Sequence, residues 1–164
     1  MLLRTTGKPK NVPIKFCKRA LNFFAKTLLT EKNYSEIEIF LKFDIDDLDY
    51  EDLGCTEWID TNLRAREYII TVRPTLGIKT TLVTIAHEMV HVKQYAAGQL
   101  IDFVHSSKYN KCRWKGKIRN NFTNPIEYWD MPWEIEAHGR EKGLYYKFLA
   151  QDIEYQKYLS NKRK

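Results

Sequence analysis

The sequence has few cysteines, and their spacing is not that of a disulfide framework or of a cysteine-based zinc site. The 164 residues include three cysteines, Cys17, Cys55 and Cys112. Their number is odd, they lie far apart, and none belongs to a CxxC pair. The sequence therefore argues against a disulfide-stapled secreted domain and against a zinc ribbon. We expect buried or idle thiols in a reducing compartment.

Long apolar runs are also missing from the sequence. The first residues, MLLRTTGKPKNVPIKF, contain no apolar stretch long enough for a signal peptide. No segment approaches the roughly 20 apolar residues of a membrane-spanning helix, and no internal repeat divides the chain. We therefore expect one domain over residues 1–164, with no membrane partner, in the cytoplasm of a bacterial or a phage-infected cell.

Positive charge is in excess over negative charge. The chain has 27 Lys and Arg against 21 Asp and Glu, a net charge of +6. Much of this charge lies in Lys108–Arg119 and in the tail Asn161–Lys164. A basic surface attracts nucleic acid or acidic proteins, and a solvated surface can have the same composition. Both interpretations stay open, and the functional one predicts DNA contact through Lys108–Arg119.

Apolar periodicity predicts a helix followed by three strands in the first half of the chain. Apolar residues at spacings of three and four predict a helix over Pro13–Thr30. Alternation predicts a strand over Glu36–Phe43, and an acidic loop or short exposed helix follows at Asp44–Asp52. Two further strands are expected at Cys55–Asp60 and Glu67–Arg73.

The second half of the chain is predicted to be mainly helical. One helix starts at Thr80 or Thr81 and runs through Gln94. A basic insertion at about 100–122 follows, either a hairpin or an irregular loop, and then a long helix over Trp133–Leu159. The order predicts an α+β domain with an N-terminal helix, a three-stranded, mostly antiparallel sheet, a central helix and a long C-terminal helix.

The strongest chemical signal is the HExxH motif His87-Glu88-Met89-Val90-His91. Residues i and i+4 of a helix point the same way, so His87 and His91 can bind one Zn²⁺ ion at about 2.0–2.1 Å. Glu88 lies on the flank of that face, where a carboxylate can take a proton from water activated by the metal. We therefore predict a metal-dependent hydrolase with Glu88 as its general base.

A catalytic zinc site needs a third protein ligand, and a later segment offers three candidates. In PWEIEAH, Glu134 and His138 share one helical face, whereas Glu136 points about 200° away from Glu134. Glu134 and Glu136 therefore cannot both be ligands. The spacing alone leaves Glu134, Glu136 and His138 open as alternatives.

These two motifs, HEMVH and a later E-x-x-A, resemble the zincin metallopeptidases of the gluzincin type. The resemblance implies that Glu134 is the third zinc ligand and that Ala137 permits close helix packing. In gluzincins the residue after this alanine is often an aspartate that supports a ligand histidine; here it is His138. The chain also has a general likeness to small SprT-like proteins of phages and bacteria, which use a third histidine and act on DNA-bound proteins.

The resemblance implies a zincin-like fold and a zinc-dependent peptidase that cleaves a protein or peptide. It also implies a substrate-binding edge strand, for which Tyr68–Val72 is the candidate, and an oxyanion stabiliser, for which Tyr95 is the candidate. A lone His105 is expected at the surface. Two other functions stay open: a SprT-like DNA-associated protein with a basic nucleic-acid-binding surface, and a catalytically inactive zincin-like binding protein.

Overall fold

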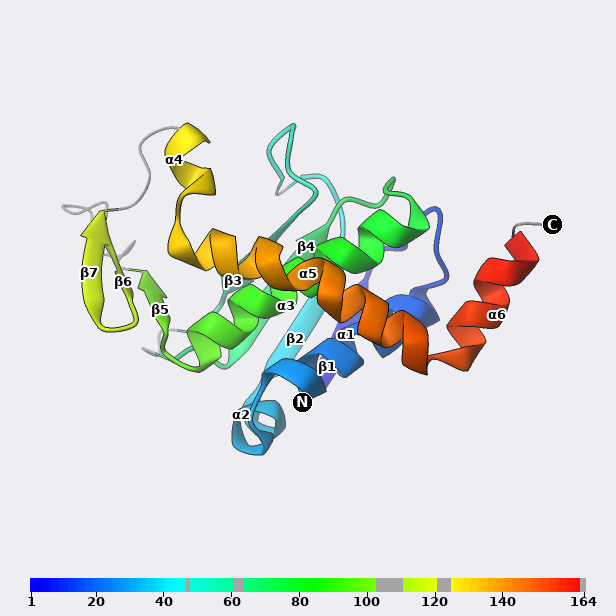
Figure 1. The fold of residues 1–164 in the computed structure, drawn as a ribbon, viewed down its shortest axis with the longest axis horizontal. Coiled ribbons are helices and arrows are strands. Elements are labelled where there is room, and N and C mark those ends of the chain that lie inside the picture. Colours follow the sequence, from blue (N-terminus) through cyan, green and yellow to red (C-terminus); the bar gives the residue numbers. More distant parts are fainter. Residues whose placement is uncertain (47, 61–63, 103–110, 121–124, 163–164) are drawn as a thin grey trace.

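A four-stranded mixed sheet forms the base of the fold (Figure 1). The computed structural model describes residues 1–46, 48–60, 64–102, 111–120 and 125–162. In chain order the strands are β1 (Leu2–Thr6), β2 (Glu38–Phe43), β3 (Gly54–Trp58) and β4 (Glu67–Val72). Their order in the sheet is β1-β2-β4-β3, so β1 and β3 are its edges.

The α+β class is confirmed, but the expected three-stranded, mostly antiparallel sheet is wrong. β2 pairs in parallel with both β1 and β4, and only β3 and β4 are antiparallel. Parallel neighbours need a crossover connection. Between β1 and β2 this connection is made by α1 (Ile14–Leu28) and α2 (Glu31–Glu36). β1 was not predicted because its sequence, LLRTT, is short and becomes a strand through its pairing with β2.

Two long helices place the HExxH motif between the sheet and the outer surface. α3 (Ile78–Ala96) carries the motif and packs on the sheet beside α1. α5 (Pro132–Gln151) packs along α3 on the side away from the sheet (Figure 1). α3 begins at Ile78, after the N-cap Gly77, rather than at Thr80 or Thr81.

The predicted long C-terminal helix is in fact two helices. α6 (Ile153–Lys162) follows α5 after Asp152, whose φ of −92° and ψ of 90° are not helical. One Asp152 oxygen accepts the Tyr155 N–H at 2.9 Å, and the other accepts from Arg19 of α1 at 2.6 Å. Asp152 therefore caps α6 and ends α5. Apolar periodicity alone does not reveal this break.

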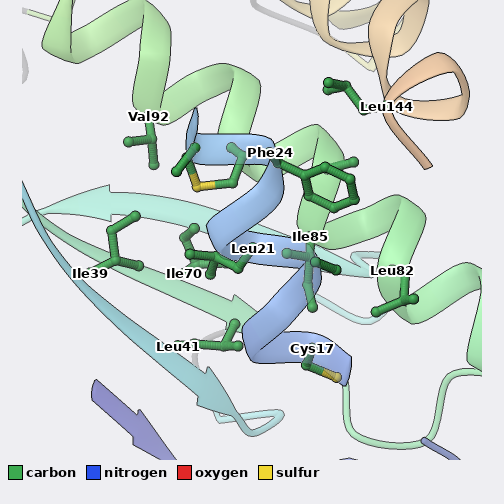
Figure 2. Close-up of a cluster of buried hydrophobic side chains, with 14 of the residues drawn as sticks. Cys17, Leu21, Phe24, Ile39, Leu41, Ile70, Leu82, Ile85, Val92 and Leu144 are labelled. Atoms are coloured by element: carbon green, nitrogen blue, oxygen red, sulfur yellow. The ribbon is translucent and has the colours of Figure 1, made fainter. Parts of the chain in front are cut away.

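The main core lies where α1, α3 and the sheet meet (Figure 2). In β2 the buried residues alternate with partly exposed ones, as the sequence predicted. Each fully buried aliphatic or aromatic side chain contributes roughly 1.5–3 kcal/mol. Core residues from α1, the sheet and α3 include Leu21, Phe24, Ile39, Leu41, Ile70, Leu82 and Ile85.

The basic insertion contains a small second sheet. Its strands, β5 (Leu100–Asp102), β6 (Lys111–Trp114) and β7 (Lys117–Asn120), are antiparallel in the order β5-β6-β7. Lys115 and Gly116 both have positive φ, 46° and 84°, as in the tight turn of a two-residue hairpin. The hairpin alternative is therefore confirmed for this part. His105 lies outside the described residues.

Candidate metal centre

α3 brings the two histidines of the HExxH motif together. His87 and His91 are separated by one helical turn, and their ring centroids are 4.8 Å apart. Both are buried, as is Glu88 between them in sequence. The apolar residues that precede the motif place this part of α3 in the core. Local helix geometry therefore produces the pair that the spacing predicted.

The third side chain comes from the first turn of α5. The Glu134 carboxylate lies 3.3 Å from His87 Nε2 through one oxygen and 3.4 Å from His91 Nε2 through the other. The two Nε2 atoms are 3.1 Å apart. Ala137, fully buried and one turn after Glu134, provides the small side chain expected where two helices pack closely. The three groups together could hold a metal ion.

The spacing of these groups fits zinc. Ligands at about 2.0–2.1 Å in a tetrahedron are separated by about 3.4 Å, close to the three separations of 3.1–3.4 Å. Two imidazoles and one carboxylate are also a donor set typical of catalytic zinc. The donor set and the spacing of the cluster therefore fit one Zn²⁺ ion.

The two other candidates for the third ligand bond to other side chains. Glu136 turns away from the histidines and accepts a hydrogen bond from Lys93 at 2.8 Å. His138 lies beside the His87 ring but directs its Nδ1 towards Glu141, at 3.2 Å. His87, His138 and Glu141 form a second group that could hold a metal ion. Glu134 therefore lies within 3.4 Å of both HExxH histidines, and its role as the third zinc ligand stays a prediction.

Gln94 holds the His91 ring. The Gln94 amide nitrogen donates to the Trp133 carbonyl at 3.0 Å, so its amide oxygen faces His91 Nδ1 at 2.9 Å. An amide oxygen accepts only. His91 Nδ1 therefore carries a proton and donates it to Gln94, which directs Nε2 towards His87 and Glu134.

Glu141 holds the His87 ring in the same way. One Glu141 oxygen lies 2.9 Å from His87 Nδ1, and because an ionised carboxylate only accepts, Nδ1–H donates to it. The sequence motifs did not predict this role for Glu141. The available signal was the position of Glu141, seven residues or two turns after Glu134 on the same helical face.

Glu88 is held by the edge strand β3. The Thr56 hydroxyl donates to the Glu88 carboxylate at 2.8 Å. β3 can approach α3 this closely because Gly54 has no side chain: a Cβ there would lie 2.6 Å from Thr84 Cγ2 and 3.3 Å from a Glu88 oxygen. Neither Thr56 nor Gly54 was a predicted site residue, since the strand and the helix meet only in the folded chain.

β3, rather than β4, is the free edge beside this helix. β4 is paired on both sides, with β2 and β3, so the prediction that Tyr68–Val72 forms the substrate-binding edge is wrong. In the described part of the chain, β3 pairs with β4 alone. The sequence predicted both strands but not the order of strands in the sheet.

The buried charges shift one another's pKa values. Burial alone would lower the pKa of His87, but hydrogen bonds to Glu134 and Glu141 outweigh it and raise this pKa to about 10. Burial would raise the pKa of Glu134, yet its bonds to both histidines hold that pKa far below its usual range. Burial raises the pKa of Glu88, although both histidines oppose the rise. Glu88 is therefore a stronger base than an exposed glutamate.

Two tyrosines lie near the centre. The Tyr128 hydroxyl, from α4 (Pro125–Trp129), donates to Glu134 at 2.7 Å. Burial and the Glu134 charge raise the pKa of Tyr128, which therefore stays neutral. Tyr95 packs its ring on Trp58, with centroids 4.7 Å apart. Its role as an oxyanion stabiliser stays a prediction.

Comparisons with known proteins add no family to this description. Neither a protein-family model, nor a curated protein, nor a solved structure matches the chain. Among the described residues, no helix has both the length and the apolar composition needed to cross a membrane. The interpretation of the site therefore depends on its own chemistry.

Proposed function

We propose that the protein is a zinc-dependent peptidase of the zincin type, with His87, His91 and Glu134 as metal ligands and Glu88 as general base. The observation that carries the proposal is the convergence of two imidazoles and one carboxylate, all buried, beside a second carboxylate with a raised pKa. We also propose a cytoplasmic location, because three widely spaced cysteines suit a reducing compartment.

Zinc in this site would supply Lewis acidity, which polarises a carbonyl group and lowers the pKa of water to about 7. Glu88 takes the proton of the attacking water and returns it to the leaving amine. Thr56 fixes the Glu88 carboxylate through its hydrogen bond, so the base stays beside the ligand face of α3. Glu134 stays ionised because its pKa is lowered.

The free edge of β3 suits an extended peptide. Alternate residues of β3 contact successive positions along α3. Gly54 lies against Thr84, Thr56 bonds to Glu88, and Trp58 packs on Tyr95. A peptide that added to this edge as a further strand would pass beside Glu88. The substrate class that we propose is therefore a protein or peptide segment without stable secondary structure.

The test replaces Glu88 by Gln. Glu88→Gln has almost the same volume and leaves all three ligands, so we expect one zinc ion per chain and unchanged folding. Hydrolysis of an unstructured peptide library should fall by about 10²–10⁴-fold, the usual contribution of a general base. Glu31→Gln, at an exposed position of α2, is the matched control and should keep activity.

Full activity of Glu88→Gln would contradict the mechanism. If the parent protein binds zinc with the expected ligands but hydrolyses no peptide in the library, the inactive zincin-like binding protein becomes the better interpretation. Mass spectrometry of the products would give the cleavage sites and hence the substrate preference.

A DNA-associated function is a second candidate, because the β6–β7 hairpin concentrates basic residues. Lys115, Lys117 and Arg119 are exposed on this hairpin. If they contact phosphates, the affinity for DNA should fall steeply with salt, with a slope of about −0.9 per phosphate contact. Charge reversal at Lys117 and Arg119 should reduce this slope, whereas charge reversal at the exposed α5 residues Lys142 and Lys147 should not. Absence of binding at low salt would remove this candidate.

A further inference from the structure

We infer that Glu141 is a positioning residue for the metal centre, held in place by His138 and acting through His87. It accepts the His87 Nδ1–H and thereby presents His87 Nε2 to the metal. This inference rests on the proposed zinc site, but not on the nature of the reaction that the site catalyses. Carboxylates that orient a metal-binding imidazole commonly raise metal affinity by 10–100-fold.

The contacts of Glu141 join two imidazoles through one oxygen. The same oxygen lies 2.9 Å from His87 Nδ1 and 3.2 Å from His138 Nδ1. The Glu141 side chain is 14% exposed, so solvent competes little for this oxygen. Because a carboxylate oxygen only accepts, both Nδ1 atoms donate to it, and the position of Glu141 is fixed from two sides.

α5 therefore supplies both carboxylates that His87 touches. Glu134 and Glu141 are seven residues apart, two turns along one face of α5, and that face packs on α3 (Figure 1). Glu134 meets His87 Nε2, and Glu141 meets His87 Nδ1. The imidazole is thus held at both nitrogens by one helix, with the buried Ala137 between the two carboxylates.

His138 holds the Glu141 carboxylate in place through its Nδ1–H, and we call this contact the clamp. Its ring stacks on Trp129 of α4, with centroids 5.0 Å apart and an interplanar angle of 27°. The His138 ring also lies 4.5 Å from the His87 ring. The His138 side chain is 37% exposed, and its Nδ1 is directed at Glu141 at 3.2 Å. This explains how a histidine can stand where gluzincins often have an aspartate: the carboxylate comes from the next turn.

The competing explanation is a second metal ion. His87, His138 and Glu141 have ligand atoms within 4.8 Å of one another, as His87, His91 and Glu134 do. His87 belongs to both groups. Its Nδ1 would have to lose its proton to bind a second ion, which removes the hydrogen bond to Glu141. The number of zinc ions per chain therefore separates the two explanations.

The experiment compares Glu141→Gln with Glu141→Met in the full chain. Both variants lose the charge and keep a helix-forming side chain of similar length, but only glutamine keeps an oxygen acceptor. We expect Glu141→Met to weaken zinc binding by about 10–100-fold, measured by competition with a chromophoric chelator, and Glu141→Gln to weaken it clearly less. Glu154→Gln on α6 controls for the loss of a paired carboxylate and should bind zinc like the parent.

A second readout follows the His87 ring itself. In the zinc-loaded parent, the Nδ1–H proton of His87 should give an imidazole signal protected from exchange in ¹⁵N–¹H spectra. Glu141→Gln should keep this signal, and Glu141→Met should lose it. Circular dichroism of the metal-free variants shows whether the fold is kept, and if Glu141→Met does not fold, the smaller loss expected for His138→Ala tests the clamp.

Three results would overturn the inference: equal zinc affinity in the parent and Glu141→Met; a protected His87 Nδ1–H signal in that variant; or two zinc ions per parent chain with one lost in His138→Ala. Failure of the peptidase proposal looks different. In that case zinc affinity follows the expected order of variants, while no peptide is hydrolysed.

Discussion

The two histidines of the HExxH motif are supported in different ways. His91 is held by Gln94, a neutral amide one turn further along the same helix. His87 is held by Glu141, a carboxylate from another helix. Hydrogen bonds to an ionised group are roughly twice as strong as those between neutral groups. One imidazole is therefore positioned by local helix geometry, and the other depends on the packing of α5 against α3.

The largest expected effect on zinc affinity comes from changing Glu134, whose carboxylate contacts both histidines. Glu134→Gln should weaken zinc binding on the order of a thousandfold, given apparent free energies of about 10–16 kcal/mol for four-ligand zinc sites. Glu136→Gln, two residues away and bonded to Lys93, is the matched control and should retain zinc. Metal analysis after dialysis against a chelator gives the answer. Zinc loss in Glu136→Gln and not in Glu134→Gln would show that Glu136, rather than Glu134, is the third ligand.

A change in pH should alter zinc affinity through His87. In the metal-free protein, His87 carries a proton on both ring nitrogens below its pKa of about 10. Zinc has to displace the proton on Nε2. Apparent affinity should therefore rise with pH, by up to about tenfold per pH unit for each proton released, and level off near pH 10. His91, whose pKa is also raised, adds to this slope. Chelator competition from pH 6 to pH 10 measures it, and an affinity that did not change with pH would contradict the protonation described above.

The smallest effect is expected for the neutral support of His91. Gln94→Leu removes the amide that bonds His91 Nδ1 and the Trp133 carbonyl. We expect a loss of stability of about 1–3 kcal/mol from the buried groups left without partners. The loss of zinc affinity should be smaller than in Glu141→Met. The exposed Gln151→Leu on α5 serves as control, and urea unfolding with chelator competition separates the two effects.

A larger loss of zinc affinity in Gln94→Leu than in Glu141→Met would contradict the proposed difference between the two imidazoles. It would mean that the local amide orients its ligand more strongly than the carboxylate from α5. Equal losses of zinc affinity in Gln94→Leu and Glu141→Met would mean that the charge of Glu141 does not strengthen its hydrogen bond to His87.

The amino-acid sequence predicts the parts of the site that lie within one helical turn. The spacing of His87 and His91 places both rings on one face because the rise and twist of a helix are the same in every context. The same local rules predicted α1, β2 and the α+β class. They did not predict the end of α5 at Asp152, where a side-chain cap and an ion pair with Arg19 compete with the helix.

Tertiary structure alone decided which other residues meet these histidines. Thr56 reaches Glu88, and Glu141 reaches His87, across 32 and 54 residues of chain. No spacing rule connects such positions, since their contact depends on the order of strands in the sheet and on how α5 packs on α3. The sequence predicted that His87, Glu88 and His91 lie on one helical turn, whereas the packing of separate elements determined which residues hold them in place.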